Sequence, residues 1–294
     1  PAWAALNSAT GEISGAAEAG VFDNIILTVN DSRGGSASLP AFSIKIINWA
    51  VQKTGVTDYI YEGEDGMYQN GLSPEFSKSG NIVYDGLNAL FWQYDSAVSS
   101  VSYRWQEAAD YCASLEMDGY SDWRLPTLKE METVIDYAGT GDYVIDTFEN
   151  GAAGAFWTSD SDASDDSRAW LVDFSNGSDI FNSKTGNLSY ARCVRSDFPY
   201  TAADLARDDT TGIITDKNTS LMWQDTAEAA TNYLSWNFGM AYCEALDLGG
   251  YADWRLPNIR ELKSIMVRTD KANGYMSRVF LNRASGEFDY YISS

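Results

Sequence analysis

The cysteines and the carboxylates are the residues of this chain whose types and spacing could do chemistry. The 294 residues include three cysteines and no histidine. Without histidine, the chain forms by itself neither a Ser–His or Cys–His catalytic pair nor a histidine-ligated zinc site. Two kinds of site remain open to these residues: a disulfide between cysteines and a cation site made of carboxylate oxygens.

The densest group of carboxylates lies in the run 159–168. Four aspartates fall within seven residues there, namely Asp160, Asp162, Asp165 and Asp166. Ca²⁺ takes about six to eight oxygen ligands, often from carboxylates on loops. The run lacks the glycine and the terminal glutamate of an EF-hand loop, so it is either a calcium site of another kind or a solvated acidic loop. Asp31, in the Gly-rich turn 30–35, is a second calcium candidate.

The overall charge restricts the possible partners. The chain has 20 Lys and Arg against 42 Asp and Glu, a net charge of −22. So acidic a surface repels phosphate backbones and anionic membranes, and we expect no nucleic-acid partner. We also expect no membrane span, because no apolar run is long enough. Residues 1–20 lack the basic and apolar regions of a signal peptide.

The chain contains an internal repeat. Residues 105–126 and 236–257 share 11 of 22 positions at a spacing of 131 residues, including Trp-x6-Cys and the pentapeptide DWRLP. The same spacing aligns Phe-Trp-Gln at 91–93 with Met-Trp-Gln at 222–224. We therefore predict two copies of one module, module one at 78–197 and module two at 209–294, joined by a linker at 198–208.

The three cysteines follow the repeat. Cys112 and Cys243 occupy equivalent positions, and Cys193 lies near the end of module one, where module two has no counterpart before Ser294. We therefore predict a Cys112–Cys193 disulfide, an unpaired Cys243 and a C-terminally truncated module two. The alternative is three buried free thiols in a reducing compartment, because disulfides persist in oxidising ones.

Each copy has the pattern of an α+β module. Apolar residues recur with helical period over 105–115. A second helix is expected after DWRLP, where Thr127 with Glu130 and Asn258 with Glu261 have the spacing of a capping box. Short apolar runs between turn formers then predict strands, which we expect to pair antiparallel. These strands are expected at 156–159, 169–174 and 191–195.

The DWRLP motif has a structural and a functional interpretation. Its tryptophan could stack on a sugar ring, or it could anchor the loop between the helices. Repetition in both copies favours structure, because each copy must pack in the same way, and we expect the arginines to pair with nearby glutamates. The motif residues are Trp123, Arg124, Pro126 and Glu130 in module one and Trp254, Arg255, Pro257 and Glu261 in module two.

Several aromatic residues are candidates for a binding surface. Their rings offer apolar faces with a polar tip, as carbohydrate sites and protein interfaces use. The ligand-binding candidates are Tyr94, Trp157 and Tyr190. The alternative for each of them is packing in the core.

Residues 1–49 have a different pattern. Alternating runs at 21–29 and 37–47 predict two strands around a Gly-rich turn. The segment resembles the second half of a cadherin-like or Ig-like repeat of bacterial surface proteins, a β-sandwich of about 100 residues, so the sandwich would be partial. Residues 50–77 have no clear period and are expected to be a linker.

The order of motifs in the two copies resembles a known family. W-x6-C, GY-x-DWRLP, FWTS, AWLVDF-x-NG and RCVR follow one another in module one. They are similar to the C-terminal domain of the Legionella collagen-like adhesin and its bacterial relatives. The resemblance implies a variant of the C-type lectin fold in an extracellular binding module. Relatives include adhesins for glycans, some of them sulfated, and the net charge of −22 departs from a preference for sulfated ligands.

The expected architecture is therefore α+β, with two C-type-lectin-like modules, the second truncated, after a partial all-β Ig/cadherin-like sandwich. We expect a surface or extracellular adhesion protein that presents its modules to a glycan or protein ligand. The alternative is a structural subunit of an extracellular filament or surface layer, with incomplete end domains completed by neighbouring chains. We expect no enzyme, no catalytic residue and no required cofactor, with Ca²⁺ as the one cofactor considered.

Overall fold

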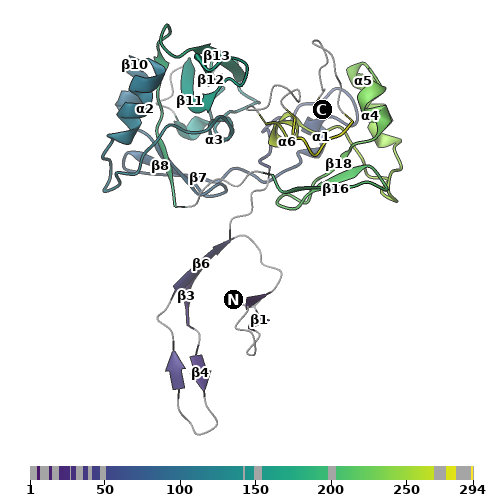
Figure 1. The fold of residues 1–294 in the computed structure, drawn as a ribbon, viewed down its shortest axis with the longest axis horizontal. Coiled ribbons are helices and arrows are strands. Elements are labelled where there is room, and N and C mark those ends of the chain that lie inside the picture. The colour runs from purple at the N-terminus through teal and green to yellow at the C-terminus, as the bar shows by residue number, and fades with distance from the viewer. Residues whose placement is uncertain are drawn as a thin grey trace. The chain divides into compact units, whose positions relative to one another are not determined.

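The structure is a computed structural model. It describes residues 5–6, 13–14, 20–26, 28–30, 36–38, 42–46, 51–141, 143–148, 154–197, 203–267, 276–282 and 293. The chain divides into two units, Pro1–Trp49 and Ala50–Ser294 (Figure 1). Asp31, one of the calcium candidates, lies outside the described residues.

The first unit consists of short antiparallel strands. β3 (Gly20–Ile25) pairs with β6 (Phe42–Ile46), and β4 (Thr28–Asn30) pairs with β5 (Ser36–Ser38), so that the four strands make one long hairpin. β1 (Ala5–Leu6) pairs with β2 (Ile13–Ser14). The hairpin follows the two strands that the alternating pattern predicts. Within the described residues the strands form two-stranded sheets, and the sandwich stays a prediction.

Module one is built around a four-stranded antiparallel sheet with the order β15-β9-β8-β7. Its strands are β7 (Phe76–Ser79), β8 (Ile82–Asp85), β9 (Leu90–Gln93) and β15 (Val194–Ser196). The first three strands follow one another along the chain. The last strand of the module returns to pair with β9, which joins the two ends of the module.

A second sheet of module one has five strands in the order β10-β14-β11-β12-β13. They are β10 (Ser102–Tyr103), β11 (Ala155–Ser161), β12 (Arg168–Asp173), β13 (Ser178–Ser183) and β14 (Ser189–Tyr190). β11 and β14 are parallel, with Phe156 opposite Tyr190, so the expectation of purely antiparallel pairing was wrong. β14 can run beside β11 because the intervening strands β12 and β13 reverse the chain twice.

Two α-helices accompany these sheets. α2 (Trp105–Ala113) buries Ala108 and Cys112 on one face, one helical turn apart. α3 (Leu128–Glu132) begins with the capping box of Thr127 and Glu130. Short 3₁₀ helices, η1 (Ser96–Ser99) and η2 (Asp146–Phe148), complete the module.

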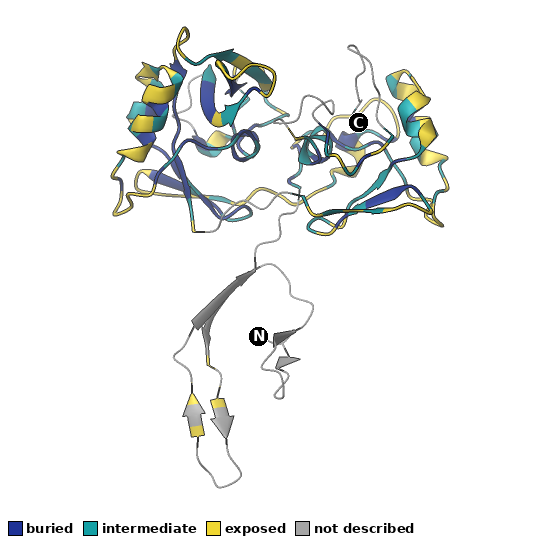
Figure 2. Cartoon of the chain, viewed as in Figure 1, coloured by how far each residue is buried: buried dark blue, intermediate teal, exposed yellow. Residues whose placement is uncertain are grey.

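Two buried clusters form the core of module one. Phe156, Trp170 and Val172 belong to one cluster, together with residues of α3. Trp157 and Leu171 belong to the other, which surrounds the cysteines and α2. Neighbouring residues of a strand point to opposite faces, so the five-stranded sheet divides the core into two apolar layers. Figure 2 shows the resulting buried strands in dark blue.

Module two repeats the first half of module one in register. β17 (Ile213–Asp216), α5 (Trp236–Glu244) and α6 (Ile259–Ser264) lie at the predicted spacing from β8, α2 and α3. β16 (Leu205–Asp208) and β18 (Met222–Gln224) flank β17 in a three-stranded sheet, and α4 (Ala227–Thr231) follows β18. The buried cluster here is small and consists of Ile214, Ile265, Met276 and Phe280.

Part of residues 51–77, which were expected to be a linker, contacts module two, whereas Phe76 and Ser77 belong to β7 of module one. The segment contains the short helix α1 (Asp65–Tyr68). Asp65 is buried, and its Oδ1 accepts a hydrogen bond from Asn258 Nδ2 at 3.2 Å. The Tyr68 hydroxyl donates to Glu244 Oε1 at 2.9 Å. These polar contacts explain why the segment has no apolar period: it is held by individual side chains rather than by an apolar stripe.

The two modules contact each other through α3 and α6. Lys129 Nζ donates to the Ser264 carbonyl at 2.8 Å, and Arg260, which occupies the equivalent position in module two, donates to the carbonyls of Glu132 (3.0 Å) and Ile135. The side chain at this position of each helix thus donates to backbone carbonyls of the other module, and the contact is reciprocal. Lys263, the equivalent of Glu132, lies 3.2 Å from it in an ion pair.

Candidate functional site

A disulfide joins the two ends of module one, as predicted. Cys112 on α2 and Cys193 next to β15 are bonded, with Cα atoms 5.4 Å apart and a sequence separation of 81. Both cysteines are fully buried. The bond fixes the last strand of the module to its first long helix.

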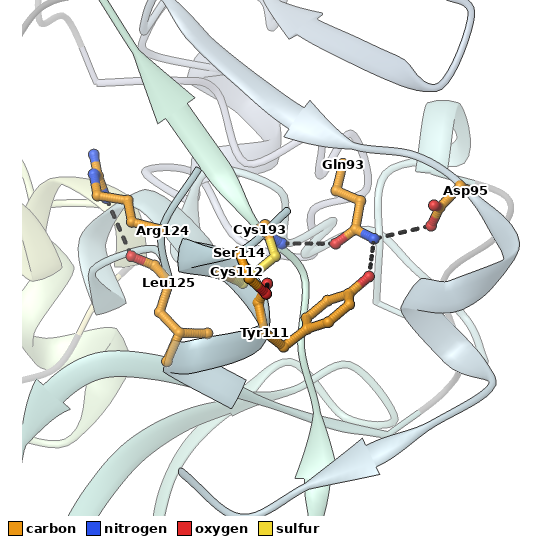
Figure 3. The surroundings of a disulfide bond; sticks show 8 residues. All are labelled: Gln93, Asp95, Tyr111, Cys112, Ser114, Arg124, Leu125 and Cys193. Atoms are coloured by element: carbon orange, nitrogen blue, oxygen red, sulfur yellow. Dashed lines mark hydrogen bonds between the residues drawn. A yellow bond between two sulfur atoms is a disulfide. The ribbon is translucent and has the colours of Figure 1, made fainter. Parts of the chain in front are cut away.

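Gln93, at the end of β9, holds the backbone of Cys193 beside α2. Its N–H donates to the Cys193 carbonyl at 2.9 Å, and its Oε1 accepts from the Cys193 N–H at 3.1 Å. The other end of the amide donates from Nε2 to the Tyr111 hydroxyl (2.7 Å) and to Asp95 Oδ1 (2.9 Å). Figure 3 shows how this buried amide connects the helix and the strand. The repeated Trp-Gln dipeptide was the sequence signal for it.

The residue before Cys193 is a buried arginine. The Arg192 guanidinium lies 4.8 Å from the centre of the Phe148 ring, and Nη1 donates to the Gln93 carbonyl at 3.0 Å. Burial lowers the pKa of Arg192 to about 10, so the group stays charged at neutral pH. A charge over an aromatic face is stabilised by the ring electrons, which partly replaces the lost hydration.

The residues after Cys193 bind the DWRLP loop. Val194 and Arg124 exchange two backbone hydrogen bonds, both of 2.9 Å. Arg195 Nε donates to Asp122 Oδ1 at 2.7 Å. β15 is therefore anchored through its backbone, through its own Arg195, and through Arg192 and Cys193 immediately before it.

The arginine of DWRLP has a structural role in module one. Arg124 donates to both oxygens of Glu130, at 2.8 and 2.6 Å, as the sequence predicts. Glu130 is 1% exposed and also accepts from the Thr127 N–H at 2.8 Å, which closes the capping box. The hydrogen bond to Glu130 raises the pKa of Arg124. Because both oxygens of Glu130 are occupied by Arg124, this pair fixes the start of α3.

The other motif residues are packed in the same way. Trp123 is 3% exposed, and Pro126 beside it is buried. In module two Arg255 repeats the two hydrogen bonds to Glu261, at 2.7 and 2.6 Å. Trp254 and Pro257 are only half-buried there, because they line a cavity described below.

The acidic run does not gather its carboxylates. Asp160 Oδ2 accepts from the Leu128 N–H at the start of α3 (2.6 Å), and the fully buried Asp162 pairs with Arg168. Asp165 accepts from Ser167, and Asp166 is exposed. Burial alone would raise the pKa of Asp162, but hydrogen bonds from Ser164 and the charge of Arg168 outweigh it and lower that pKa.

Among the described residues, no three acidic or cysteine side chains lie close enough together to hold a metal ion. Calcium binding at the acidic run stays a prediction. It would require Asp160 and Asp162 to exchange their protein partners for the ion.

The predicted ligand-binding aromatics of module one are packed in its interior. Trp157 is fully buried and donates from Nε1 to the Tyr103 carbonyl at 2.8 Å. Tyr94 is 5% exposed, and Lys78 Nζ covers its ring at 3.8 Å. Neither ring presents a free face to a ligand. Tyr190 is half-buried and keeps some accessible surface beside Phe156.

Exposed aromatic rings lie instead around the first turn of α5. Tyr233 is 84% exposed, Phe238 is 65% exposed, and the Tyr61 ring lies 5.9 Å from that of Trp236. We call these four residues the α5 aromatic group. Its members at 233 and 238 correspond to Ser102 and Glu107 in module one. Comparison of the two copies could not indicate this group, because its exposed members are aromatic only in module two.

Module two contains a cavity of about 890 Å³. It lies between β18, α5 and the DWRLP loop, and Trp223, Cys243, Asp253, Arg255 and Phe280 are among its lining residues. In module one the corresponding place is occupied by β15, which pairs with β9 and bonds to α2 through its cysteine.

Cys243 is the free cysteine at this cavity, as predicted. It is half-buried, and burial together with the charge of Glu244 raises the pKa of its thiol to about 11. A thiol that is protonated at neutral pH is a weak nucleophile. The raised pKa therefore disfavours Cys243 as a nucleophile.

The two repeated modules agree with a comparison of the chain to models of protein families. None of the described helices has the length and apolar character needed to cross a membrane. No curated protein matches the chain. The model of one family, the Lcl C-terminal domain, matches residues 81–195 and again residues 212–294, which are the two modules found as a repeat. The chain therefore belongs to the Lcl C-terminal domain family, an adhesin-related family of surface proteins, and contains two copies of its domain.

Proposed function

We propose that this protein is an adhesin of the cell surface or the extracellular space, whose tandem lectin-like modules bind a glycan or protein ligand without catalysing a reaction. The observation that carries the proposal is the family match over both modules. The buried Cys112–Cys193 disulfide supports an oxidising location, because such bonds persist outside the reducing cytosol.

We place the ligand contact on the α5 aromatic group. Exposed aromatic rings supply apolar contact area at a low cost in side-chain entropy. The rings of Tyr61 and Trp236 already meet edge to face, and two highly exposed rings lie within three residues of Trp236. The net charge of −22 favours neutral or basic ligands over sulfated ones.

A glycan array and a protein-binding screen with the whole chain test the proposal. We expect a bound glycan or protein, and loss of at least tenfold in affinity when Tyr233→Ser and Phe238→Ser are combined, which corresponds to about 1.4 kcal/mol. Leu188→Ser is the matched control, because this side chain is 57% exposed but belongs to module one. Arms with Ca²⁺ and with EDTA test the calcium prediction. An unchanged affinity of the double variant would contradict the placement.

A structural subunit of a filament or surface layer is the second candidate. Mass photometry of the purified chain separates the candidates: regular polymers favour the structural subunit, and monomers favour the adhesin.

A further inference from the structure

A row of aromatic side chains lies on one face of the four-stranded sheet of module one. Phe91 on β9 is opposite Tyr84 on β8 and also opposite Arg195 on β15, so the three side chains share this face. Their neighbours Trp92 and Val194 point to the other face and belong to the core. The Tyr84 and Phe91 rings are half-buried, and their centres are 4.8 Å apart.

Tyr120 extends this row to the surface. Its ring centre lies 5.9 Å from that of Phe91, and the residue is 39% exposed. The Arg195 guanidinium lies 4.8 Å from the centre of the Phe91 ring and 4.1 Å from that of the Tyr120 ring, so it contacts both rings. We call Tyr84, Phe91, Tyr120 and Arg195 the sheet-face group.

The backbone of Tyr120 is held in a tight turn. Met117 and Tyr120 exchange two hydrogen bonds, of 3.0 and 2.9 Å, and Asp118 and Gly119 between them both have a positive φ. This is the backbone of a two-residue hairpin turn. Trp123 Nε1 also donates to the Tyr120 carbonyl at 3.2 Å. The exposed ring is therefore presented by an ordered backbone, which reduces the entropy that a ligand must remove on binding.

Polar groups surround the exposed ring. Arg195 donates from Nε to Asp122 Oδ1 at 2.7 Å and from Nη2 to Asp197. The two carboxylate side chains are still 56% and 52% exposed, so both keep lone pairs that a ligand can use. Arg195 is 5% exposed, and its buried Nη1 has no hydrogen-bond partner among the described residues. Buried donors without an acceptor are rare, so this one indicates an acceptor from solvent or from a ligand.

The exposed tyrosine and aspartate belong to the repeated motif. Gly-Tyr-x-Asp precedes Trp-Arg-Leu-Pro in both copies, which places Tyr251 and Asp253 at the positions of Tyr120 and Asp122. Packing accounts for the tryptophan, the arginine and the proline of the motif in module one. Tyr120 and Asp122 keep accessible surface there. The motif therefore combines a packed part with an exposed part.

We propose that the sheet-face group, together with Asp122 and Asp197, is a binding site for one uncharged pyranose ring of a glycan. The C–H face of the sugar lies on the exposed side of the Tyr120 ring, and its hydroxyls donate to the two carboxylates. A small rotation of the Tyr120 ring gives a sugar oxygen access to Arg195 Nη1. Hydroxyl groups both donate and accept, so a sugar can satisfy both kinds of group.

The charges at the site favour an uncharged sugar. Asp122 and Asp197 share the single guanidinium of Arg195, which leaves one carboxylate in excess. Sulfated sugars and uronic acids are therefore repelled. An ammonium group would meet Arg195, which is already the cation over the Tyr120 ring. A neutral ring avoids both conflicts.

This inference rests on the proposed function, because it takes module one to be a ligand-binding module. It deepens that function by naming the class of sugar and by adding a site apart from the α5 aromatic group. The sheet-face group belongs wholly to module one, whose strands β8, β9 and β15 carry three of its four members.

The test is a titration of the whole chain with the methyl glycosides of glucose, galactose, mannose and N-acetylglucosamine, followed by saturation-transfer NMR. We expect at least one of them to bind, with saturation strongest on the ring C–H protons. Tyr120→Ser should weaken that binding at least tenfold, because the stacking face is lost. Tyr120→Phe keeps the face and should change the affinity less than threefold. Leu188→Ser is the matched control at an exposed apolar residue of the same module.

Substitutions of Asp197 separate a sugar from a cation. Asp197→Ala removes an acceptor and should weaken the neutral glycoside roughly fivefold, the usual effect of one hydrogen bond. Asp197→Asn keeps an acceptor oxygen and should weaken it less. A cationic ligand would follow the charge instead, so Asn and Ala would be equally harmful and added salt would weaken binding. Glucosamine and a sulfated N-acetylglucosamine are the charged arms of the titration.

The inference is overturned if none of the four neutral glycosides binds, if their binding survives Tyr120→Ser, or if glucosamine alone binds in a salt-dependent way. The Asp197 variants keep the test decisive if Tyr120→Ser does not fold, because that side chain is half-exposed.

The failure of this inference is distinguishable from the failure of the proposed function. The combined Tyr233→Ser and Phe238→Ser variant should bind the methyl glycosides as the original chain does. Binding of a screened ligand that is lost in this variant but survives Tyr120→Ser overturns the sheet-face site alone. A chain that binds no glycan and no protein overturns both.

Discussion

Module one and module two share their helices and their first three strands but differ in what completes the core. In module one the disulfide, Gln93 and two arginines fasten β15 across the sheet from α2. In module two the corresponding groups surround a cavity. The capping box and the Arg–Glu pair are nevertheless formed in both copies. The start of the module is therefore specified by local contacts, and its closure depends on a strand that is distant in sequence.

The largest difference between the modules should appear on removal of their cysteines. Cys112→Ser combined with Cys193→Ser opens a loop of 81 residues, and chain entropy predicts a loss of about 4 kcal/mol in the free energy of unfolding. Cys243→Ser removes a free thiol and should change that free energy by less than about 0.5 kcal/mol. Urea denaturation under non-reducing conditions measures both, and equal losses would refute the structural asymmetry.

The second prediction concerns what the modules share. Glu130→Ala leaves the Arg124 guanidinium and the Thr127 N–H without their acceptor and should cost about 2 kcal/mol. Glu261→Ala should cost a similar amount, because Arg255 and the Asn258 N–H lose the same contacts. Thermal unfolding of both variants checks this. An effect confined to one copy would show that DWRLP has different roles in the two modules.

A smaller effect is expected at the contact between the modules. Although burial alone would lower the pKa of Lys263, the charges of Glu132 and Asp179 raise it, so the ammonium is stabilised there. Glu132→Lys should cost roughly 1–2 kcal/mol by placing two cations together. Adding Lys263→Glu should restore part of the loss, with the remainder due to Asp179. A double-mutant cycle gives the coupling, and additive losses would contradict a direct ion pair.

The smallest effect is a pH dependence that we expect from Asp122 of module one. The hydrogen bond from Arg195 lowers the pKa of Asp122, so its contribution is present above the unfolded pKa of about 3.9 and is lost as the pH falls through the lower, folded value. The side chain is 56% exposed, which limits the contribution to about 0.5 kcal/mol.

Urea denaturation measures the free energy of unfolding at pH 7 and at pH 3. The difference between these two values should be smaller for Asp122→Asn than for the original chain. Equal pH dependence in the variant and the original chain would contradict the ion pair of Asp122 with Arg195.

The local features of the fold could be predicted from the sequence. The period of apolar residues located α2, the capping boxes located α3 and α6, and the 131-residue spacing placed all three in register. The disulfide followed from the repeat, because the odd cysteine of module two had an equivalent that needed a partner. Each of these signals lies within a few residues or in a direct comparison of the two copies.

The long-range features could not be predicted. The parallel pairing of β11 with β14 depends on how β12 and β13 fold between them, and no short pattern records it. The packing of α1 rests on single polar contacts such as that of Asp65 with Asn258. Trp157 was a binding candidate because exposure cannot be read from residue type, and its burial follows from the two-layered core.

The reciprocal helix contact has a consequence for assembly. Position 132 and its counterpart 263 meet face to face, and they carry opposite charges. Pairing of module one with another module one in this geometry would confront two carboxylates, and pairing of module two with itself would confront two ammonium groups. Only the unlike pair brings opposite charges together at that point. The charges at this one helix position therefore favour the contact between module one and module two over a contact between two copies of the same module.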